Sequence, residues 1–277
     1  MATQDMIAGH WGTGDVYGRI LDAMRAAGLD PDRVDIAALS PVDHFHARGF
    51  AATVELADAL PIRAGDVIVD IGCGLGGPAR YIADRFGCRV EGIDITAPFV
   101  DAGNRLSALV GMEDRVAILT ADACALPFGD GAFDGGYAQH VTMNIADRAL
   151  FFREAARVLK PGVVFALTEH GLGPTGAPRH PLPWSDDGTG AWLIPPDETV
   201  AGLEAAGFTE IEVRDTGPAY LAAYRQAIDR AERGALPPFG VHILLGETAP
   251  AKIRNAALNI EEGRTHPVQI VCRKAGG

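Results

Sequence analysis

The sequence predicts an α/β fold in which a seven-stranded, mostly parallel sheet is covered by helices on both faces. Two observations support this prediction. From Val67 onward, short apolar runs alternate with segments of helical periodicity, which is the pattern of successive strand–helix units. The apolar runs are also continuous rather than alternating, as in strands that are buried on both faces of a parallel sheet. The expected strands are Val67–Ile71, Arg89–Ile93, Val116–Leu119, Phe133–Ala138, Val163–Thr168, Thr209–Arg214 and Pro267–Arg273.

Helices are expected between these strands. Pro78 lies where a helix starts, and Pro161-Gly162 follows another, because proline fits the first turn of a helix but cannot continue one. Gly135 and Gly136 weaken the prediction of the fourth strand, since glycine lowers strand propensity. The expected helices are Pro78–Phe86, Pro98–Val110, Asp147–Leu159 and Pro196–Ala206.

The regular alternation ends after Thr168, and the rest of the chain predicts additions to the core. Gly171–Pro183 is rich in Gly and Pro, which indicates a loop. A long insertion separates the last two strands and has helical patterns at Ala219–Arg233 and Thr248–Glu262. We expect four parts: an N-terminal helical segment or lid (1–60), the core (61–215), a helical insertion that forms a second lid (216–266), and the last strand with a tail (267–277).

Composition and charge restrict the possible functions. Hydrophobic residues make up 48% of the chain and charged residues 22%, as in a soluble globular protein. The formal net charge of −12, without a Lys/Arg cluster, argues against nucleic acid as a partner and suits neutral or cationic small molecules. The four cysteines lack metal-ligand spacing, so we expect free thiols and no metal. With no signal-peptide pattern and no long apolar run, we expect a cytoplasmic monomer or homodimer without a membrane partner.

A glycine-rich turn follows the first expected strand and precedes the first expected helix. Gly72, Gly74 and Gly77 fit the pattern G-x-G-x-x-G, in which the missing Cβ atoms let the backbone approach a ligand closely. Asp94 comes about 20 residues later, at the end of the second strand, where a carboxylate can accept hydrogen bonds from a ribose. This combination indicates a Rossmann-like cofactor site, and by itself it fits both NAD-dependent oxidoreductases and methyltransferases.

Asp70, directly before the first glycine, distinguishes these two alternatives. Its carboxylate suits a cofactor that carries an ammonium and a sulfonium group. A pyrophosphate would instead bring a like charge close to it in a cleft of low dielectric constant. The sequence therefore favours S-adenosylmethionine over NAD.

Several segments together resemble the class I S-adenosylmethionine-dependent methyltransferases often called type 11. The first motif of that family resembles VIVDIGCGLGG, the acidic residue of the second is found in GIDIT, and two later segments resemble TADACALPFGDGAFD and REAARVLKPG. The bacterial sarcosine/dimethylglycine methyltransferase-like subgroup further resembles DHFHARGFAAT and QHVTMNI. The chain departs from the subgroup at Arg48-Gly49-Phe50, where two glycines and an arginine are usual, and from the family at Val163, where glycine is common.

The resemblance implies which residues bind S-adenosylmethionine. Asp70 would support the ammonium of the methionine part, and Asp94 would bind both ribose hydroxyls. Gln139 would lie near the sulfonium. The remaining implied contacts are Gly72, Gly74, Phe45 and His46 at the methionine part, and Ile95, Asp122 and Ala123 at the adenine.

His140, Glu169 and His170 are the candidate catalytic residues. Each is expected to follow a strand at the carboxyl edge of the sheet, where parallel sheets bind their ligands. The simpler interpretation of His140 is a histidine at the surface or behind the site, and that of Glu169 and His170 is an ordinary loop pair. We expect three segments to build an acceptor pocket there: the chain around His46, the loop Glu169–Trp192 and the insertion Thr216–His266, whose helices must bury an apolar face.

These observations predict an S-adenosylmethionine-dependent methyltransferase that acts on a small molecule by direct in-line transfer. The resemblance to the subgroup implies N-methylation of a small amine such as sarcosine or dimethylglycine. O-, C- or S-methylation of another small metabolite stays open, because a shared fold does not settle the substrate. An NAD-dependent oxidoreductase and a non-catalytic cofactor-binding protein are the remaining alternatives.

Overall fold

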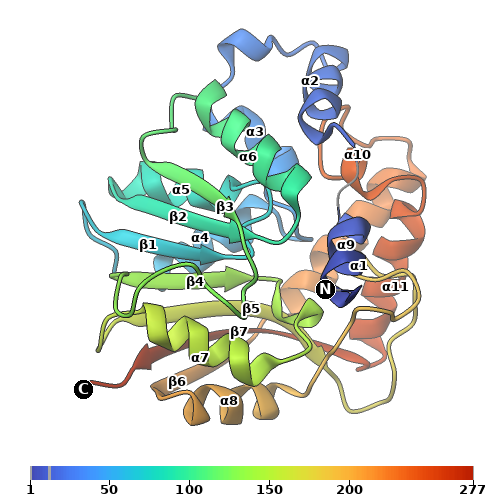
Figure 1. The fold of residues 1–277 in the computed structure, drawn as a ribbon. Helices are drawn as coiled ribbons and strands as arrows, with labels where there is room; N and C mark the ends of the chain where they lie inside the picture. The colour runs from blue at the N-terminus through green and yellow to red at the C-terminus, as the bar shows by residue number, and fades with distance from the viewer. Residues whose placement is uncertain (1, 12–13, 277) are drawn as a thin grey trace.

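The computed structural model describes residues 2–11 and 14–276. The strands in these ranges form one seven-stranded sheet (Figure 1). Its strands are β1 (Val67–Ile71), β2 (Arg89–Asp94), β3 (Val116–Thr120), β4 (Gly135–Gln139), β5 (Val164–Leu172), β6 (Phe208–Asp215) and β7 (Thr265–Lys274). They lie in the order β3-β2-β1-β4-β5-β7-β6, in which β7 runs antiparallel to both of its neighbours and β1 to β5 are parallel. The predicted Rossmann-like, mostly parallel α/β fold is confirmed.

Helices cover both faces of this sheet, as continuous apolar strands require. One face carries α4 (Phe50–Asp58), α5 (Gly77–Phe86) and α6 (Ala97–Leu109), and the other carries α7 (Arg148–Val158) and α8 (Pro196–Ala205) (Figure 1). Buried Phe151 and Phe152 of α7 pack in one cluster with Phe165 and Phe208 of the sheet. Ile82 of α5 packs on the opposite face with Val90 and Val116.

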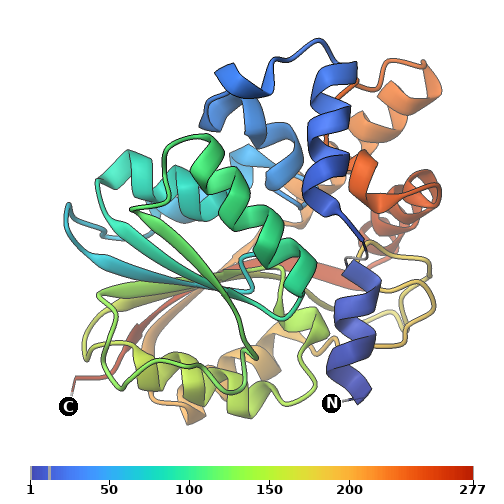
Figure 2. The same ribbon diagram turned by 45° about the horizontal axis from the view of Figure 1, so that its top comes forward.

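The remaining helices gather at the carboxyl ends of the parallel strands. They are α1 (Ala2–Trp11), α2 (Val16–Ala26) and α3 (Ile36–Asp43) from the N-terminal segment, and α9 (Gly217–Glu232), α10 (His242–Leu245) and α11 (Ala249–Glu261) from the insertion. Figure 2 shows the blue N-terminal helices beside the orange helices of the insertion, and Ile20 of α2 packs in one buried cluster with Ile243 of α10. Within the described ranges, no helix is long and apolar enough to cross a membrane.

Three elements differ from the sequence-based expectation. The fifth strand continues to Leu172, because antiparallel pairing with β7 extends to the Leu172–Thr265 pair. Glu169 and His170 therefore lie within a strand, and the prediction that they follow it is wrong. The fourth strand begins only at Gly135, since Phe133 pairs with Leu159 in an isolated bridge. The short helix α10 was not expected, and its Ile243 and Leu244 are partly buried against the cluster that contains Ile20 of α2.

Candidate active site

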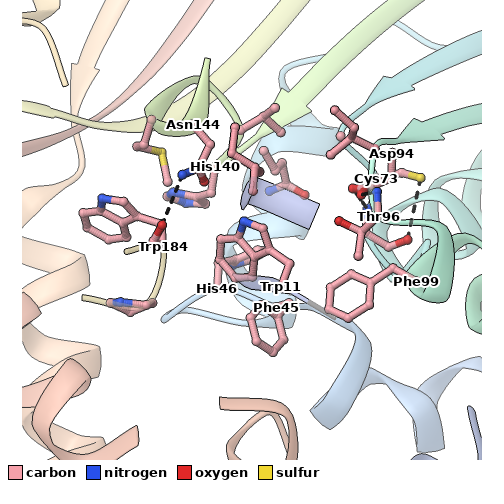
Figure 3. A pocket seen from close by; sticks show the side chains of 18 of the residues that line it. Trp11, Phe45, His46, Cys73, Asp94, Thr96, Phe99, His140, Asn144 and Trp184 are labelled. Atoms are coloured by element: carbon pink, nitrogen blue, oxygen red, sulfur yellow. Dashed lines mark hydrogen bonds between the residues drawn. The ribbon is translucent and has the colours of Figure 1, made fainter. Parts of the chain in front are cut away.

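A cavity of about 480 Å³ opens at the carboxyl ends of β1, β2 and β4 (Figure 3). The loop after β1 and Asp94 at the end of β2 line one part of it. Trp11 of α1, Trp184 of the loop after β5 and Tyr224 of α9 line another part. The volume lies within the range of about 300–1,000 Å³ that is usual for ligand pockets. The N-terminal segment, the loop after β5 and the insertion therefore meet over the strand ends in a single cavity.

Two carboxylates line this cavity from neighbouring strands: Asp70, which is buried, and Asp94, which is half-buried. The backbone N–H groups of Gly74 and Thr96 donate to the two oxygens of Asp94 at 2.9 and 2.8 Å, and the Tyr137 hydroxyl donates to Asp70 at 2.9 Å. Burial raises the pKa of Asp94, and it raises the pKa of Asp70 to about 8. Cationic and hydroxyl donors would favour the ionised carboxylates, so this pair suits a ligand with an ammonium and a ribose.

The glycine loop between these carboxylates permits close approach of a ligand to the backbone. Gly72 has a φ of 79°, and a Cβ atom on it would come within 2.3 Å of a methyl carbon of Val141. The N–H groups of Gly72 and Cys73 both donate to the carbonyl of Ile93, at 2.8 and 2.9 Å, which ties the loop to β2. Glycine is therefore required at position 72 for both conformation and space.

Every residue that the resemblance implied for the cofactor lines this same cavity. Gln139 is oriented by the Thr53 hydroxyl of α4, which donates to its side-chain oxygen at 3.2 Å. Phe45 lies edge-on against Trp11, with ring centres 5.6 Å apart. The full set is Phe45, His46, Asp70, Gly72, Gly74, Asp94, Ile95, Asp122, Ala123 and Gln139.

Three histidine rings meet at the same cavity, where the strands end. His140 lies between His46 and His170, with ring centres 5.4 and 5.3 Å away. Burial lowers the pKa of His46 and of His170 to about 3 and lowers the pKa of His140 well below its usual range, so all three rings are neutral near pH 7. His140 also has a φ of 55°, a conformation that is strained for a non-glycine residue. Such strain is concentrated at functional sites.

Glu169, the third candidate catalytic residue, lies away from the cavity. Its side chain is fully buried, does not line the cavity, and accepts hydrogen bonds from Arg148 at 2.6 Å, Thr142 at 2.6 Å and Thr199 at 2.7 Å. These contacts join β5 to α7 and α8, which identifies Glu169 as a structural residue. We therefore exclude it from the catalytic groups and keep His140 and His170 as candidates.

An ion pair that the sequence did not reveal joins the N-terminal segment to the glycine loop. Arg80 of α5 is fully buried and donates to Asp43 of α3 at 2.8 Å. Arg80 also donates to the Leu75 carbonyl at 2.7 Å, to the Gly103 carbonyl at 3.1 Å and to the Ser107 hydroxyl at 2.9 Å. One guanidinium thus holds the N-terminal segment, the glycine loop and α6 together. In the sequence, Arg80 looks like one more charged residue on an amphipathic helix.

Other chains of known function share this sequence pattern and fold. The family model described as "Methyltransferase domain" matches residues 69–167. The 27-O-demethylrifamycin SV methyltransferase of Amycolatopsis mediterranei is 34% identical over 183 residues, which are 65% of this chain and 67% of that relative. The methyltransferase GfsG of Streptomyces halstedii is 32% identical over 163 residues, so the match spans only about half of this chain and of that relative, 56% of each.

Solved structures of low sequence identity show the same fold. The geranyl diphosphate C-methyltransferase of Streptomyces coelicolor, solved with S-adenosyl-L-homocysteine, has a TM-score of 0.74 and 22% identity, and the match covers 99% of each chain. A structure described as a sarcosine dimethylglycine methyltransferase from Galdieria sulphuraria has a TM-score of 0.62 and 16% identity, with 81% of this chain and 83% of that one covered. At these identities the likeness extends to the fold alone.

Proposed function

Because this chain belongs to the family of S-adenosylmethionine-dependent methyltransferases, we propose that it transfers the cofactor's methyl group to a small, uncharged and largely apolar acceptor. The observation that carries this proposal is the continuity of one cavity. It connects the glycine loop and Asp94 to the space enclosed by the N-terminal segment, the loop after β5 and the insertion. A cofactor and an acceptor bound together there would lie in contact.

The cofactor would lie along the strand ends. Asp94 would accept from the ribose hydroxyls, and Asp70 would face the ammonium. Ile95, Asp122 and Ala123 would surround the adenine. Gln139 lines the cavity at the end of β4, directly before His140 in the chain, and the sulfonium would lie nearest to it.

S-Adenosylmethionine supplies an electrophilic methyl group on a sulfonium. The work left to this chain is to align the acceptor with that group and to exclude water. We propose that the helical segments 1–60 and 216–266 act as lids for this purpose. Trp11 from the first segment and Tyr224 from the second line the cavity and support that assignment.

The chemistry of the cavity wall favours an uncharged acceptor. Among the described residues that line it, none is a lysine or an arginine. The carboxylate of sarcosine or dimethylglycine would therefore find no counter-cation in the acceptor part. That part is apolar and aromatic instead, with Ile7, Trp11, Met143, Pro183, Trp184, Ala227, Leu245 and Ile253. This wall supports a neutral metabolite with a hydrocarbon or aromatic body over the small amino acids that the subgroup resemblance implied.

We expect S-adenosylhomocysteine to stabilise the protein and NAD to leave its stability unchanged. A ligand at about 100 times its dissociation constant adds ~2.7 kcal/mol to the free energy of unfolding. For a chain of this size the melting temperature should then rise by several degrees. Thermal unfolding with each compound measures this, and a rise with NAD alone would favour an oxidoreductase.

A screen of acceptors by product mass tests the second half of the proposal. The panel pairs uncharged phenols, enols and alcohols that have apolar bodies with sarcosine, dimethylglycine and phosphoethanolamine. We expect methylated products from the uncharged group only. Turnover confined to the amino acids would contradict the proposed acceptor class and leave the cofactor assignment intact.

A further inference from the structure

A tyrosine of the insertion is hydrogen-bonded to the histidine at the end of β4. Tyr220 lies in the first turns of α9 and is 1% exposed. Its hydroxyl oxygen lies 2.5 Å from Nε2 of His140. Tyr220 does not line the cavity, whereas His140 does, so the tyrosine can reach a bound acceptor only through the histidine.

The position of the His140 ring is fixed from several sides. Its backbone N–H donates to the Thr168 carbonyl of β5 at 2.8 Å, and its φ of 55° turns the side chain out of the line of the strand. The rings of His46, His170 and Tyr220 all have centres within 5.4 Å of the His140 ring. Such a ring has little freedom to exchange the places of its two nitrogens.

The hydrogen bond of the Tyr220 hydroxyl determines which nitrogen of the His140 ring carries the proton. Across residues 2–11 and 14–276, Nε2 of His140 is the one hydrogen-bond partner of the Tyr220 hydroxyl. A buried hydroxyl that does not donate costs about 1–3 kcal/mol. Tyr220 therefore donates to Nε2, which must be unprotonated to accept. In a neutral imidazole the proton is then on Nδ1.

The remaining nitrogen is accessible from the cavity. Nδ1 of His140 makes no hydrogen bond within the described part of the chain. The fully buried unpaired side-chain atoms include Nδ1 of His46 and of His170 but not Nδ1 of His140. Because His140 lines the cavity, its N–H group meets whatever occupies that space.

We propose that Tyr220 holds His140 as the tautomer protonated at Nδ1, so that this histidine presents an N–H donor to the methyl acceptor instead of acting as its base. This inference rests on the proposed function, and Tyr220 is a positioning residue in it. The acceptor then has an oxygen with a free lone pair beside the atom that is methylated, such as a carbonyl or ether oxygen. It reacts at an atom that His140 does not deprotonate.

Nitrogen NMR of protein labelled with ¹⁵N-histidine measures the tautomer directly. The variant His140→Gln assigns the His140 signals, and spectra are recorded near neutral pH with and without S-adenosylhomocysteine. We expect an unprotonated Nε2 and a protonated Nδ1 in the native protein. In Tyr220→Phe this preference should be lost, since Nε2 no longer receives a hydrogen bond. Affinity for S-adenosylhomocysteine should stay unchanged.

Tyr224→Phe is the matched control. Tyr224 is a buried tyrosine one turn further along α9, and its ring lies 6.3 Å from that of His170, with no hydrogen bond to His140. The tautomer of His140 should survive this change. A native His140 protonated at Nε2, or one that is the same in Tyr220→Phe, would overturn the inference.

Failure of the Tyr220→Phe variant to fold and failure of the native protein to bind the cofactor product have different consequences. If Tyr220→Phe does not fold, the native spectrum alone decides, because it shows which nitrogen is protonated. If the native protein fails to bind S-adenosylhomocysteine in calorimetry, the proposed function falls while the tautomer measurement stands on its own.

Discussion

Replacing Asp94 with alanine is expected to weaken S-adenosylhomocysteine binding at least tenfold. The carboxylate lies half-buried at the end of β2, and its two oxygens accept hydrogen bonds from the N–H groups of Gly74 and Thr96. Hydrogen bonds from both ribose hydroxyls to this charged group are worth about 1.5–3 kcal/mol. Each ~1.4 kcal/mol is a factor of ten in the dissociation constant. Alanine also leaves the Gly74 N–H without an acceptor, which loosens the glycine loop.

Calorimetric titration measures this effect, with Asp101→Ala as the control. Asp101 lies on the exposed side of α6, where its side chain is 67% exposed and pairs with Arg105. Its replacement should leave the dissociation constant unchanged. An Asp94→Ala protein that melts like the native one and binds S-adenosylhomocysteine equally well would show that the ribose site is elsewhere.

Replacing Arg80 with methionine is expected to lower the free energy of unfolding by about 3–5 kcal/mol, because it leaves the buried Asp43 carboxylate without its partner. The same change removes hydrogen bonds to Leu75, Gly103 and Ser107. Methionine fills much of the vacated volume, so the effect is mostly electrostatic. Urea unfolding measures the loss.

Arg85→Met is the matched control on the same helix. Arg85 pairs with Asp58, but their side chains are 35% and 56% exposed, and an exposed pair of this kind contributes about 0–1 kcal/mol. Equal losses in the two variants would contradict the view that the Arg80–Asp43 pair joins the N-terminal segment to the core. Arg80→Met should also weaken cofactor binding, since Leu75 belongs to the glycine loop.

The fold could be predicted from sequence where neighbouring residues determine it. The apolar run Val67–Ile71, the glycines after it and Pro78 specify a strand, a turn and a helix by local chemistry alone. The reversed direction of β7 has no such local cause. It arises from pairing with β5 far away in the chain, and the same pairing extends β5 past Thr168.

The candidate site likewise contains residues that the sequence could predict and residues that it could not. Asp70 was found from its place before the glycine turn, Asp94 from its place at the end of the second strand, and Gln139 from the family resemblance. All three lie at or next to strand ends, which converge in a parallel sheet. Trp11, Arg80 and Tyr220 were missed because their roles depend on partners from other elements. Glu169 was predicted to be catalytic by position in the chain, but its neighbours Arg148 and Thr199 come from helices that only the folded structure brings to it.

A crystal structure of the protein with S-adenosylhomocysteine tests directly whether the cofactor binds along the strand ends. We expect the ribose on the Asp94 carboxylate, the adenine beside Ile95 and Asp122, and the sulfur next to Gln139 with open space toward His140 and Trp184. Density for the ligand outside this cavity, or with the adenine among the aromatic side chains of the acceptor part, would contradict this placement.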